Sequence, residues 1–206
     1  MKLYSMPSSG NSYKVRLLLA LTGQPCDIVD VEDSSPALEA ARTAGALPFG
    51  KAPVLEFDDG TKLAESNAIL VALGRETPFL PQEPMAQAQM LSWMFWEQNQ
   101  HEGVIAVRGA LQFYPARRHL ATPERMAELL SRGNALLAMM DAHLQQNDWL
   151  LGAHPSLADI ALYGYTHTAG SRGGFDMTQF GAINAWLARM AAQPGYIGLD
   201  DPQPTR

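Results

Sequence analysis

The chain has 206 residues, with 15 Lys and Arg against 21 Asp and Glu, so its formal net charge is −6. At about 100–200 residues per domain, this length suits one large domain or two small ones. The acidic balance argues against a general nucleic-acid binder, because an acidic surface repels phosphates. The one short basic cluster, Arg117-Arg118-His119, fits a solvated helix end or loop.

Cysteine content and hydropathy exclude further classes of protein. Cys26 is the only cysteine, so no intramolecular disulfide and no Cys-x-x-Cys pair can form. The N-terminal residues lack the apolar run of a signal peptide, and no stretch reaches the roughly 18 apolar residues of a membrane span. A hydrophobic content of 47% excludes a disordered chain. We therefore expect a reduced, cytoplasmic, globular protein that binds neither membranes nor nucleic acid.

The first 80 residues alternate short apolar runs with helical patterns. Four strands are expected, at residues 2–6, 26–31, 52–57 and 61–64. Three helices are expected, at residues 11–22, 35–44 and 66–73. Asp58-Asp59-Gly60 separates the last two strands and predicts a β-hairpin. The order β-α-β-α-β-β-α implies a mixed sheet covered by helices.

Three prolines between residues 78 and 84 mark a linker at residues 79–86. The pattern after the linker is helical almost to the end and shows no strand alternation. Four helices are expected there, at residues 87–107, 123–146, 156–169 and 181–192. We therefore predict an α/β domain over residues 1–78 and an all-α domain over residues 87–206.

Polar residues lie between the first expected strand and the first expected helix. Ligands of open α/β sheets bind at such a place, and the helix N-terminus favours an anion there. Ser9 and Asn11 are short hydrogen-bond donors in this field. The alternative is that the serines at positions 8, 9 and 12 only cap the helix.

Lys51-Ala52-Pro53 opens the third expected strand, a position that tolerates proline. A cis bond before Pro53 would turn the backbone amide of Ala52 outward for a ligand. The alternative is a plain trans turn, which base rates favour, since about 5–6% of X–Pro bonds are cis in folded proteins.

Glu65 and Ser66 open the next helix. Ser66 suits the N-cap position, and an exposed helix N-terminus with a hydroxyl suits a small carboxylate. The carboxylate of Glu65 can pair with an ammonium group, so Glu65 and Ser66 together would bind the amino-acid end of a ligand. The alternative is an ordinary cap after an acidic residue.

Other motifs favour structural interpretations. Ser156 and Asp159 have the spacing of a capping box at the start of an apolar helix. Glu97 and His101 share a helix face, which fits a surface pair, and no second histidine completes a zinc motif. The Met and aromatic stripe at residues 90–96 is typical of a helix core, part of which can wall an apolar cavity between domains.

These elements in this order resemble a cytosolic glutathione transferase over nearly the whole chain. The resemblance implies a thioredoxin-like N-terminal domain, a short linker and an all-helical C-terminal domain. Four motifs at these spacings carry it, namely Ser9, Lys51-Ala52-Pro53, Glu65-Ser66 and Ser156-x-x-Asp159. In serine-type members the activating Ser lies six residues before the Val of the first helix, as Ser9 lies before Val15.

The first loop also resembles that of the bacterial nu-type members, which reads Thr-Pro-Asn-Gly-His-Lys-Ile. Here the segment is Ser9-Gly10-Asn11-Ser12-Tyr13-Lys14-Val15, so the hydroxyl and the Asn both coincide. The beta-type catalytic Cys is absent, because Ser9 stands at its place. Cys26 matches no family nucleophile and is expected in the core.

The resemblance implies that glutathione is the co-substrate and that no metal takes part. Ser9 and Asn11 would hold the glutathione sulfur as a thiolate by hydrogen bonding. The backbone of Ala52, before a cis Pro53, would bind the cysteinyl part. Glu65 and Ser66 would bind the γ-glutamyl end, and Lys51 would reach a glutathione carboxylate.

The expected activity is conjugation of glutathione to small hydrophobic electrophiles, as in detoxification, by a cytoplasmic homodimer. The resemblance puts the electrophile site between the domains, with walls from Pro7, Tyr13, Trp96, Gln100, Arg108, Tyr114 and Tyr163.

Three other activities stay open. Nu-type members reduce disulfides or peroxides with glutathione, and two glutathiones can supply both sulfurs. Zeta-type isomerases of maleylacetoacetate carry Ser-Ser-Cys-x-Trp-Arg-Val-Arg, and Asn11 replaces their Cys. A non-catalytic homologue would keep the fold for ligand or protein binding.

Overall fold

The computed structural model describes residues 1–201 and divides the chain into two compact units. The N-terminal unit comprises Met1–Leu80 together with the segment from Ala191 onward, and the helical unit comprises Pro81–Met190. The segment after residue 190 thus groups with the N-terminal unit, whereas the sequence pattern assigned it to the helical half.

The N-terminal unit is built on one four-stranded sheet with the strand order β2-β1-β3-β4. Its strands are β1 (Lys2–Ser5), β2 (Asp27–Asp30), β3 (Val54–Glu56) and β4 (Lys62–Ala64). Its helices are α1 (Gly10–Thr22), α2 (Pro36–Thr43) and α3 (Ser66–Gly74). β1 pairs with β2 in parallel, and β3 pairs antiparallel with both β1 and β4, so the mixed sheet and the hairpin are confirmed.

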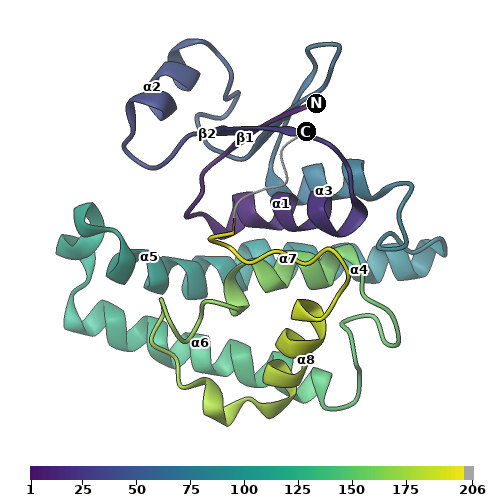
Figure 1. Cartoon of the computed structure of the whole chain (residues 1–206). Coiled ribbons are helices and arrows are strands. Elements are labelled where there is room, and N and C mark those ends of the chain that lie inside the picture. Colours follow the sequence, from purple (N-terminus) through teal and green to yellow (C-terminus); the bar gives the residue numbers. More distant parts are fainter. Residues whose placement is uncertain (202–206) are drawn as a thin grey trace. The chain divides into compact units, whose positions relative to one another are not determined.

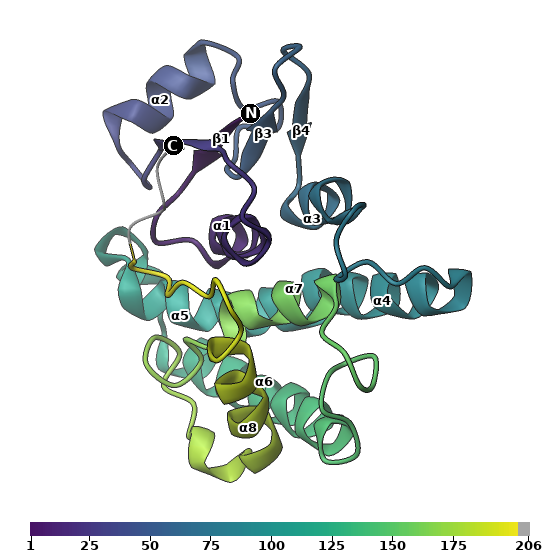
Figure 2. The same cartoon turned by 45° about the vertical axis from the view of Figure 1, so that its right-hand side comes forward.

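Helices cover both faces of this sheet. α1 and α3 lie side by side on one face and α2 lies on the other (Figures 1 and 2). The α2 face is apolar, since Leu38 and Ala41 of α2 cluster with Val54 of β3 and with Tyr4 and Val29 beside it. Alternate strand residues point to opposite faces, which sends the other apolar row toward α1 and α3.

Helix ends follow the expected chemistry in most places. Ser35 caps α2 by accepting a hydrogen bond from the Leu38 amide at 3.1 Å. Gly23 ends α1 with a left-handed φ of 63°, a backbone conformation that glycine adopts without steric cost. All four strands are one to three residues shorter than expected from the sequence, which is the usual uncertainty at element boundaries.

The helical unit begins with a continuous helical segment that is not uniformly α. It consists of α4 (Pro84–Trp96), the π-helix η1 (Glu97–Ala106) and α5 (Val107–Phe113). The sequence pattern predicts a single α-helix over residues 87–107, so the prediction is wrong in both length and type. The unit continues with η2 (Pro115–Leu120), α6 (Pro123–Leu144), α7 (Leu157–Thr166), η3 (Met177–Gln179) and α8 (Gly181–Ala191).

The π-helix overturns one interpretation of the sequence. Glu97 and His101 are both fully buried, so they do not form the expected surface pair. The Nε2 atom of His101 lies 3.1 Å from the hydroxyl of Thr166 in α7. A buried polar side chain of this kind is stabilised by its hydrogen-bond partner.

The structural interpretation of the Ser156 and Asp159 motif is confirmed. The Asp159 carboxylate completes the capping box with Ser156 at the start of α7 and also accepts hydrogen bonds from the Leu150 amide and the Trp186 indole. α6 runs beside the α4–α5 segment and α7 lies against α4 (Figure 1). In the part of the chain that the structure describes, no helix is both long enough and apolar enough to cross a membrane.

Candidate functional site

The register of the sheet brings three predicted motifs to one edge of the N-terminal unit. Val54 pairs with Tyr4 of β1 on one side and with Ala64 of β4 on the other. The residue before Val54 is Pro53, the residue after Ala64 is Glu65, and β1 ends at Ser5 before the turn to α1. Antiparallel pairing therefore places Pro53, Glu65 and the β1–α1 turn next to one another.

Ser9 is the N-cap of α1. Its side-chain oxygen accepts from the Ser12 amide at 3.4 Å, and its own amide donates to the Met6 carbonyl at 3.0 Å. The hydroxyl hydrogen has no acceptor among residues 1–201, so it can donate to a bound ligand. The two interpretations of Ser9, a cap and a ligand donor, are thus compatible, since a hydroxyl both accepts and donates.

The turn that carries Ser9 is held from within the N-terminal unit. The Met6 amide donates to the Ser12 hydroxyl at 2.9 Å, and the Arg16 guanidinium donates to the Pro7 carbonyl at 2.8 Å. Burial lowers the pKa of Arg16 below its ordinary value, and the nearby carboxylates of Asp30 and Glu32 oppose that shift without reversing it. These hydrogen bonds fix the turn against the first helix.

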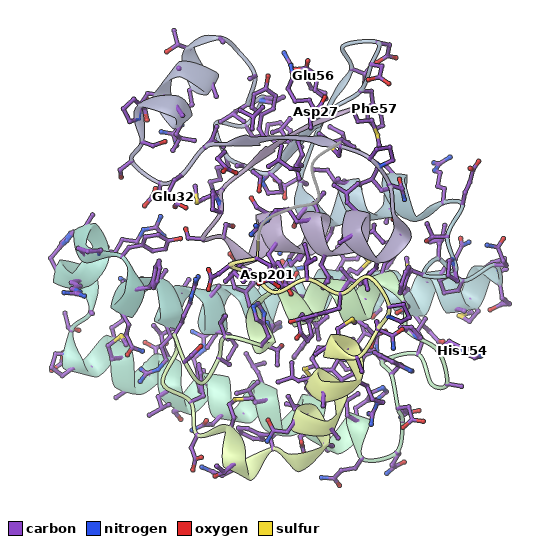
Figure 3. The ribbon with its side chains drawn as sticks, viewed as in Figure 1. Asp27, Glu32, Glu56, Phe57, His154 and Asp201 are labelled. Atoms are coloured by element: carbon purple, nitrogen blue, oxygen red, sulfur yellow. The ribbon has the colours of Figure 1, made fainter. Side chains whose placement is uncertain are left out.

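A second anchor comes from the segment that follows β2. Glu32, labelled in Figure 3, accepts from both the amide of Ser8 at 3.0 Å and the hydroxyl of Ser8 at 2.6 Å. Charge-assisted hydrogen bonds of this kind are stronger than neutral ones. Ser8 is therefore occupied by a structural role, in contrast to its neighbour Ser9.

Asn11 and Ser66 meet although they lie 55 residues apart. The Ser66 hydroxyl donates to Oδ1 of Asn11 at 3.2 Å, and the Lys14 ammonium donates to the same oxygen at 2.8 Å. The N-terminal ends of α1 and α3 are thereby joined. The role of Lys14 was not predicted from the sequence, although its i,i+3 spacing from Asn11 is a signal of contact on one helix face.

The prediction that Ser66 is the N-cap of α3 is wrong. Ser66 is the first residue of the helix, and Glu65 occupies the N-cap position without a side-chain cap hydrogen bond. The physical reason is that the Ser66 hydroxyl is directed to Asn11 instead of to an amide of its own helix. Ser66 is almost fully buried, while the side chain of Glu65 is exposed.

Glu65 adopts a strained backbone conformation, with φ at 71° and ψ at 115°. A positive φ is uncommon for any residue other than glycine and costs on the order of 1–3 kcal/mol. Such strain persists only where the surroundings impose it, and it is concentrated at ligand-binding sites. The exposed carboxylate of Glu65 is held at this edge by that geometry.

The Ala52–Pro53 peptide bond is cis, as one of the two interpretations of this motif anticipated. Pro53 is buried, Ala52 is half-buried and Lys51 is exposed. The residues predicted to bind glutathione thus lie in one part of the N-terminal unit. Their contacts to glutathione stay a prediction. Residues 1–201 contain no group of three or more His, Cys, Asp or Glu side chains arranged to hold a metal ion.

The residues predicted as walls of the electrophile site belong to both units. In the N-terminal unit, the Tyr13 hydroxyl donates to the Ile197 carbonyl at 2.7 Å and its ring is buried. Pro7 accepts the hydrogen bond from Arg16 described above. Tyr13 therefore anchors the C-terminal segment against α1.

The remaining wall residues lie in the helical unit. Arg108 donates to the carbonyls of Gly173, at 2.6 Å, and Met126, and burial lowers its pKa. Tyr163 is buried and stacks on His167, with ring centroids 5.0 Å apart.

Three further wall residues keep partial exposure. Tyr114 packs edge-on against Phe113 at 5.0 Å, and Gln100 is exposed on the π-helix. Trp96 packs edge-on against Trp93 at 5.5 Å. That these residues together wall one electrophile site stays a prediction.

Trp96 also lines a pocket built wholly from the helical unit. The pocket has a volume of about 480 Å³ and lies between α4, the C-terminal half of α6 and the following loop. His143 faces it, its ring 4.9 Å from that of Trp93 and its Nε2 3.0 Å from the Leu150 carbonyl.

Comparisons with known proteins agree with this geometry. Residues 3–81 match the domain described as "Glutathione S-transferase, N-terminal domain", and residues 104–194 match "Glutathione S-transferase, C-terminal domain". A crystal structure of a glutathione S-transferase from Pseudomonas fluorescens is 40% identical, with a TM-score of 0.91, over 97% of this chain and 98% of that one. Another structure from the same species, with two glutathione bound, is 24% identical and shares the fold with a TM-score of 0.83, over 98% of this chain and 92% of that one.

Two curated relatives differ in function. The chain is 26% identical to elongation factor 1-gamma of Drosophila melanogaster over 93% of its own length, but it spans only 44% of that protein. It is also 26% identical to the disulfide-bond oxidoreductase YfcG of Escherichia coli, over 93% of this chain and 90% of that protein. Because the two matched domains together cover most of the sequence, the chain belongs to the glutathione S-transferase family.

Proposed function

We propose that this protein binds glutathione at the edge formed by the β1–α1 turn, Pro53 and Glu65, and activates its sulfur as a thiolate for attack on small hydrophobic electrophiles. The observation that carries the proposal is the Ser9 hydroxyl, which caps α1 with its oxygen and has no acceptor for its hydrogen among residues 1–201. The glutathione bound to the relative from P. fluorescens supports the same ligand here.

The thiolate has to be stabilised because a free thiol has a pKa near 8.5. Lowering the pKa of the bound thiol by about 2 units requires about 2.7 kcal/mol. A hydrogen bond to a charged group contributes about 1.5–3 kcal/mol, so Ser9 with Asn11 and the N-terminus of α1 can supply this amount. Ser9 acts as a donor and not as a base, since its own hydroxyl is far too weak an acid.

Other residues at this edge bind the rest of the tripeptide. The backbone of Ala52, beside the cis bond, binds the cysteinyl part, and Lys51 reaches a glutathione carboxylate. The carboxylate of Glu65 pairs with the γ-glutamyl ammonium, and the backbone amide of Ser66 at the N-terminus of α3 binds the γ-glutamyl carboxylate. In conjugation by substitution, the sulfur forms a bond to an electrophilic carbon while the bond from that carbon to its leaving group breaks. The leaving group departs with the electron pair, and the thiol proton leaves to solvent.

A second activity is favoured by the similarity to YfcG over most of both chains. In glutathione-dependent disulfide reduction, the thiolate attacks a disulfide sulfur, a mixed disulfide forms and one substrate thiolate leaves. A second glutathione thiolate then releases the other substrate thiolate and forms glutathione disulfide. This chemistry needs the same thiolate site and no protein cysteine, which suits a chain whose one cysteine, Cys26, is buried.

The assembly is proposed to be a cytoplasmic homodimer. Met85 and Phe95 of α4 and Phe49 before β3 are each more than 60% exposed, at 64%, 64% and 68%. Large exposed apolar side chains favour burial against another protein surface. Analytical ultracentrifugation should give twice the 22.5 kDa of one chain.

The test of the proposal is calorimetry with glutathione, followed by assays of conjugation and of disulfide reduction. Ser9→Gly removes the hydroxyl at a cost of only a few tenths of a kcal/mol to the helix cap, and it should lower both activities at least tenfold. Ser8→Ala is the matched control, because the Ser8 hydroxyl is bound to Glu32. No binding at millimolar glutathione would leave the non-catalytic alternative, and unchanged turnover in Ser9→Gly would refute the role of the hydroxyl.

A further inference from the structure

The side-chain amide oxygen of Asn11 accepts hydrogen bonds from two residues. This atom, Oδ1, accepts from the Lys14 ammonium at 2.8 Å and from the Ser66 hydroxyl at 3.2 Å. Lys14 lies one turn further along α1 and is fully buried, and Ser66 is 3% exposed. Both partners approach the same end of the amide, so the Nδ2 group of Asn11 is turned to the opposite side.

The two partners are not chemically equivalent. A hydroxyl can donate or accept, so Ser66 is compatible with either orientation of the Asn11 amide. An ammonium group can only donate, so the atom that faces Lys14 must be the amide oxygen. Lys14 therefore determines which end of the amide carries the donors, and Ser66 alone would not.

We propose that Lys14 is a positioning residue, which holds the Asn11 amide so that its NH₂ group is presented to the glutathione sulfur. The proposal rests on the function assigned above to Ser9 and Asn11. With the amide in this orientation, Asn11 donates to the thiolate. With the amide reversed, its oxygen would face the sulfur and would favour the protonated thiol.

A competing account is that Lys14 acts only as a positive charge near the thiolate. The two accounts differ in their dependence on Asn11. If Lys14 acts through the amide, replacing Lys14 has no further effect once Asn11 is Ala. If Lys14 acts as a charge, its replacement has the same effect in either background, which a double-mutant cycle measures.

The variants at position 14 compare a side chain that can only donate hydrogen bonds with one that can donate or accept and one that can do neither. Lys14→Met removes the charge and the donor at similar length, and Lys14→Gln supplies an amide that can donate or accept. Lys14→Arg keeps a charged group that only donates. Because Lys14 is buried, the thermal unfolding of each variant is measured, and those that fold are compared.

The readout is the pKa of glutathione bound to each variant, taken from the ultraviolet absorbance of the thiolate against pH, together with kcat and the Kd for glutathione. Lys14→Met and Lys14→Gln should raise that pKa by about 1 unit, which corresponds to about tenfold less thiolate below it and about tenfold lower kcat. The Kd should change less than twofold, and Lys14→Arg should stay close to the unmodified protein. In the Asn11→Ala background, Lys14→Met should change the pKa by less than about 0.3 unit.

The outcomes separate this inference from the proposed function. An unchanged pKa in Lys14→Met and Lys14→Gln overturns the inference, and so does an equal rise in both backgrounds. If the unmodified protein binds glutathione without lowering its thiol pKa, or does not bind it, the proposed function itself fails. A rise that depends on Asn11 and is absent in Lys14→Arg supports the positioning role.

Discussion

Replacing Asp159 with Asn tests how the helical unit is held together. The Asp159 side chain is fully buried and its carboxylate accepts four hydrogen bonds. The donors are the amide of Ser156 at 2.8 Å, the hydroxyl of Ser156 at 2.9 Å, the amide of Leu150 at 2.9 Å and the indole of Trp186 at 2.9 Å. Burial raises the pKa of Asp159, and these donors oppose that rise.

The expected cost follows from the donors that lose an acceptor. In Asp159→Asn, one oxygen still accepts from Leu150 and Trp186, while the new NH₂ group faces the amide of Ser156. One unsatisfied buried donor costs about 1–3 kcal/mol, and the two retained bonds no longer have a charged acceptor. We expect a loss of about 2–4 kcal/mol in the free energy of unfolding. Ser156→Ala removes one hydroxyl from the cap and should cost about 0.5–2 kcal/mol.

Urea unfolding at neutral pH, followed by circular dichroism, measures the difference. With a slope of about 2 kcal/mol/M, the midpoint for Asp159→Asn should fall by about 1–2 M, and that for Ser156→Ala by less. Glutathione turnover per folded molecule should be unchanged, because Asp159 has a structural role. A midpoint within about 0.3 M of the unmodified protein, or a larger loss in Ser156→Ala, would refute the reasoning.

Two further predictions concern the helical unit. Glu83 caps α4 by accepting from the amides of Met85 and Ala86, which lowers its pKa below the ordinary 4.5. Because its folded-state pKa is depressed, the stabilisation from Glu83 is full above the ordinary pKa of 4.5 and is lost as the pH falls through the folded-state pKa. Glu83→Gln should therefore lower the Tm at about pH 6, and the difference should shrink as the pH falls through the acidic range. A Tm difference that is independent of pH would contradict this. A Cβ added at Gly133 would lie 2.3 Å from the Phe175 ring, so Gly133→Ala should cost about 1–3 kcal/mol in thermal unfolding, whereas Gly103→Ala, with nothing within 4 Å, should be near neutral. Equal Tm values for the two alanine variants would exclude the steric explanation.

The starts of α2, α6 and α7 agree with local helix-start chemistry. Ser35, Thr122 and Ser156 occupy the N-cap positions of α2, α6 and α7, where serine and threonine are preferred, and the capping box at Ser156 was predicted. The hairpin at Asp58-Asp59-Gly60 is local in the same sense, and Gly60 takes a positive φ of 83°. Each of these signals needs only a few neighbouring residues.

Features that depend on distant partners were missed. Nothing in the 3.6-residue periodicity of residues 97–106 distinguishes a π-helix from an α-helix, and the hydrogen bond of the buried His101 goes to Thr166, 65 residues away. Ser66 is a residue type that is preferred at the N-cap, yet its hydroxyl donates to Asn11, 55 residues away. Tertiary contacts of this kind override local propensity.

The same distinction separates the residues predicted to bind glutathione from those predicted to bind the electrophile. Ser9 was predictable because its position obeys helix-start chemistry, which leaves the hydroxyl hydrogen for a ligand while the oxygen serves the helix. Arg108 illustrates the opposite case. Its guanidinium donates to the carbonyls of Gly173 and Met126, and these distant partners could not be predicted from sequence spacing. A cation whose donors are taken up by backbone carbonyls has less to offer a substrate, so the residues that determine the electrophile are to be sought among side chains with more exposure, such as Gln100.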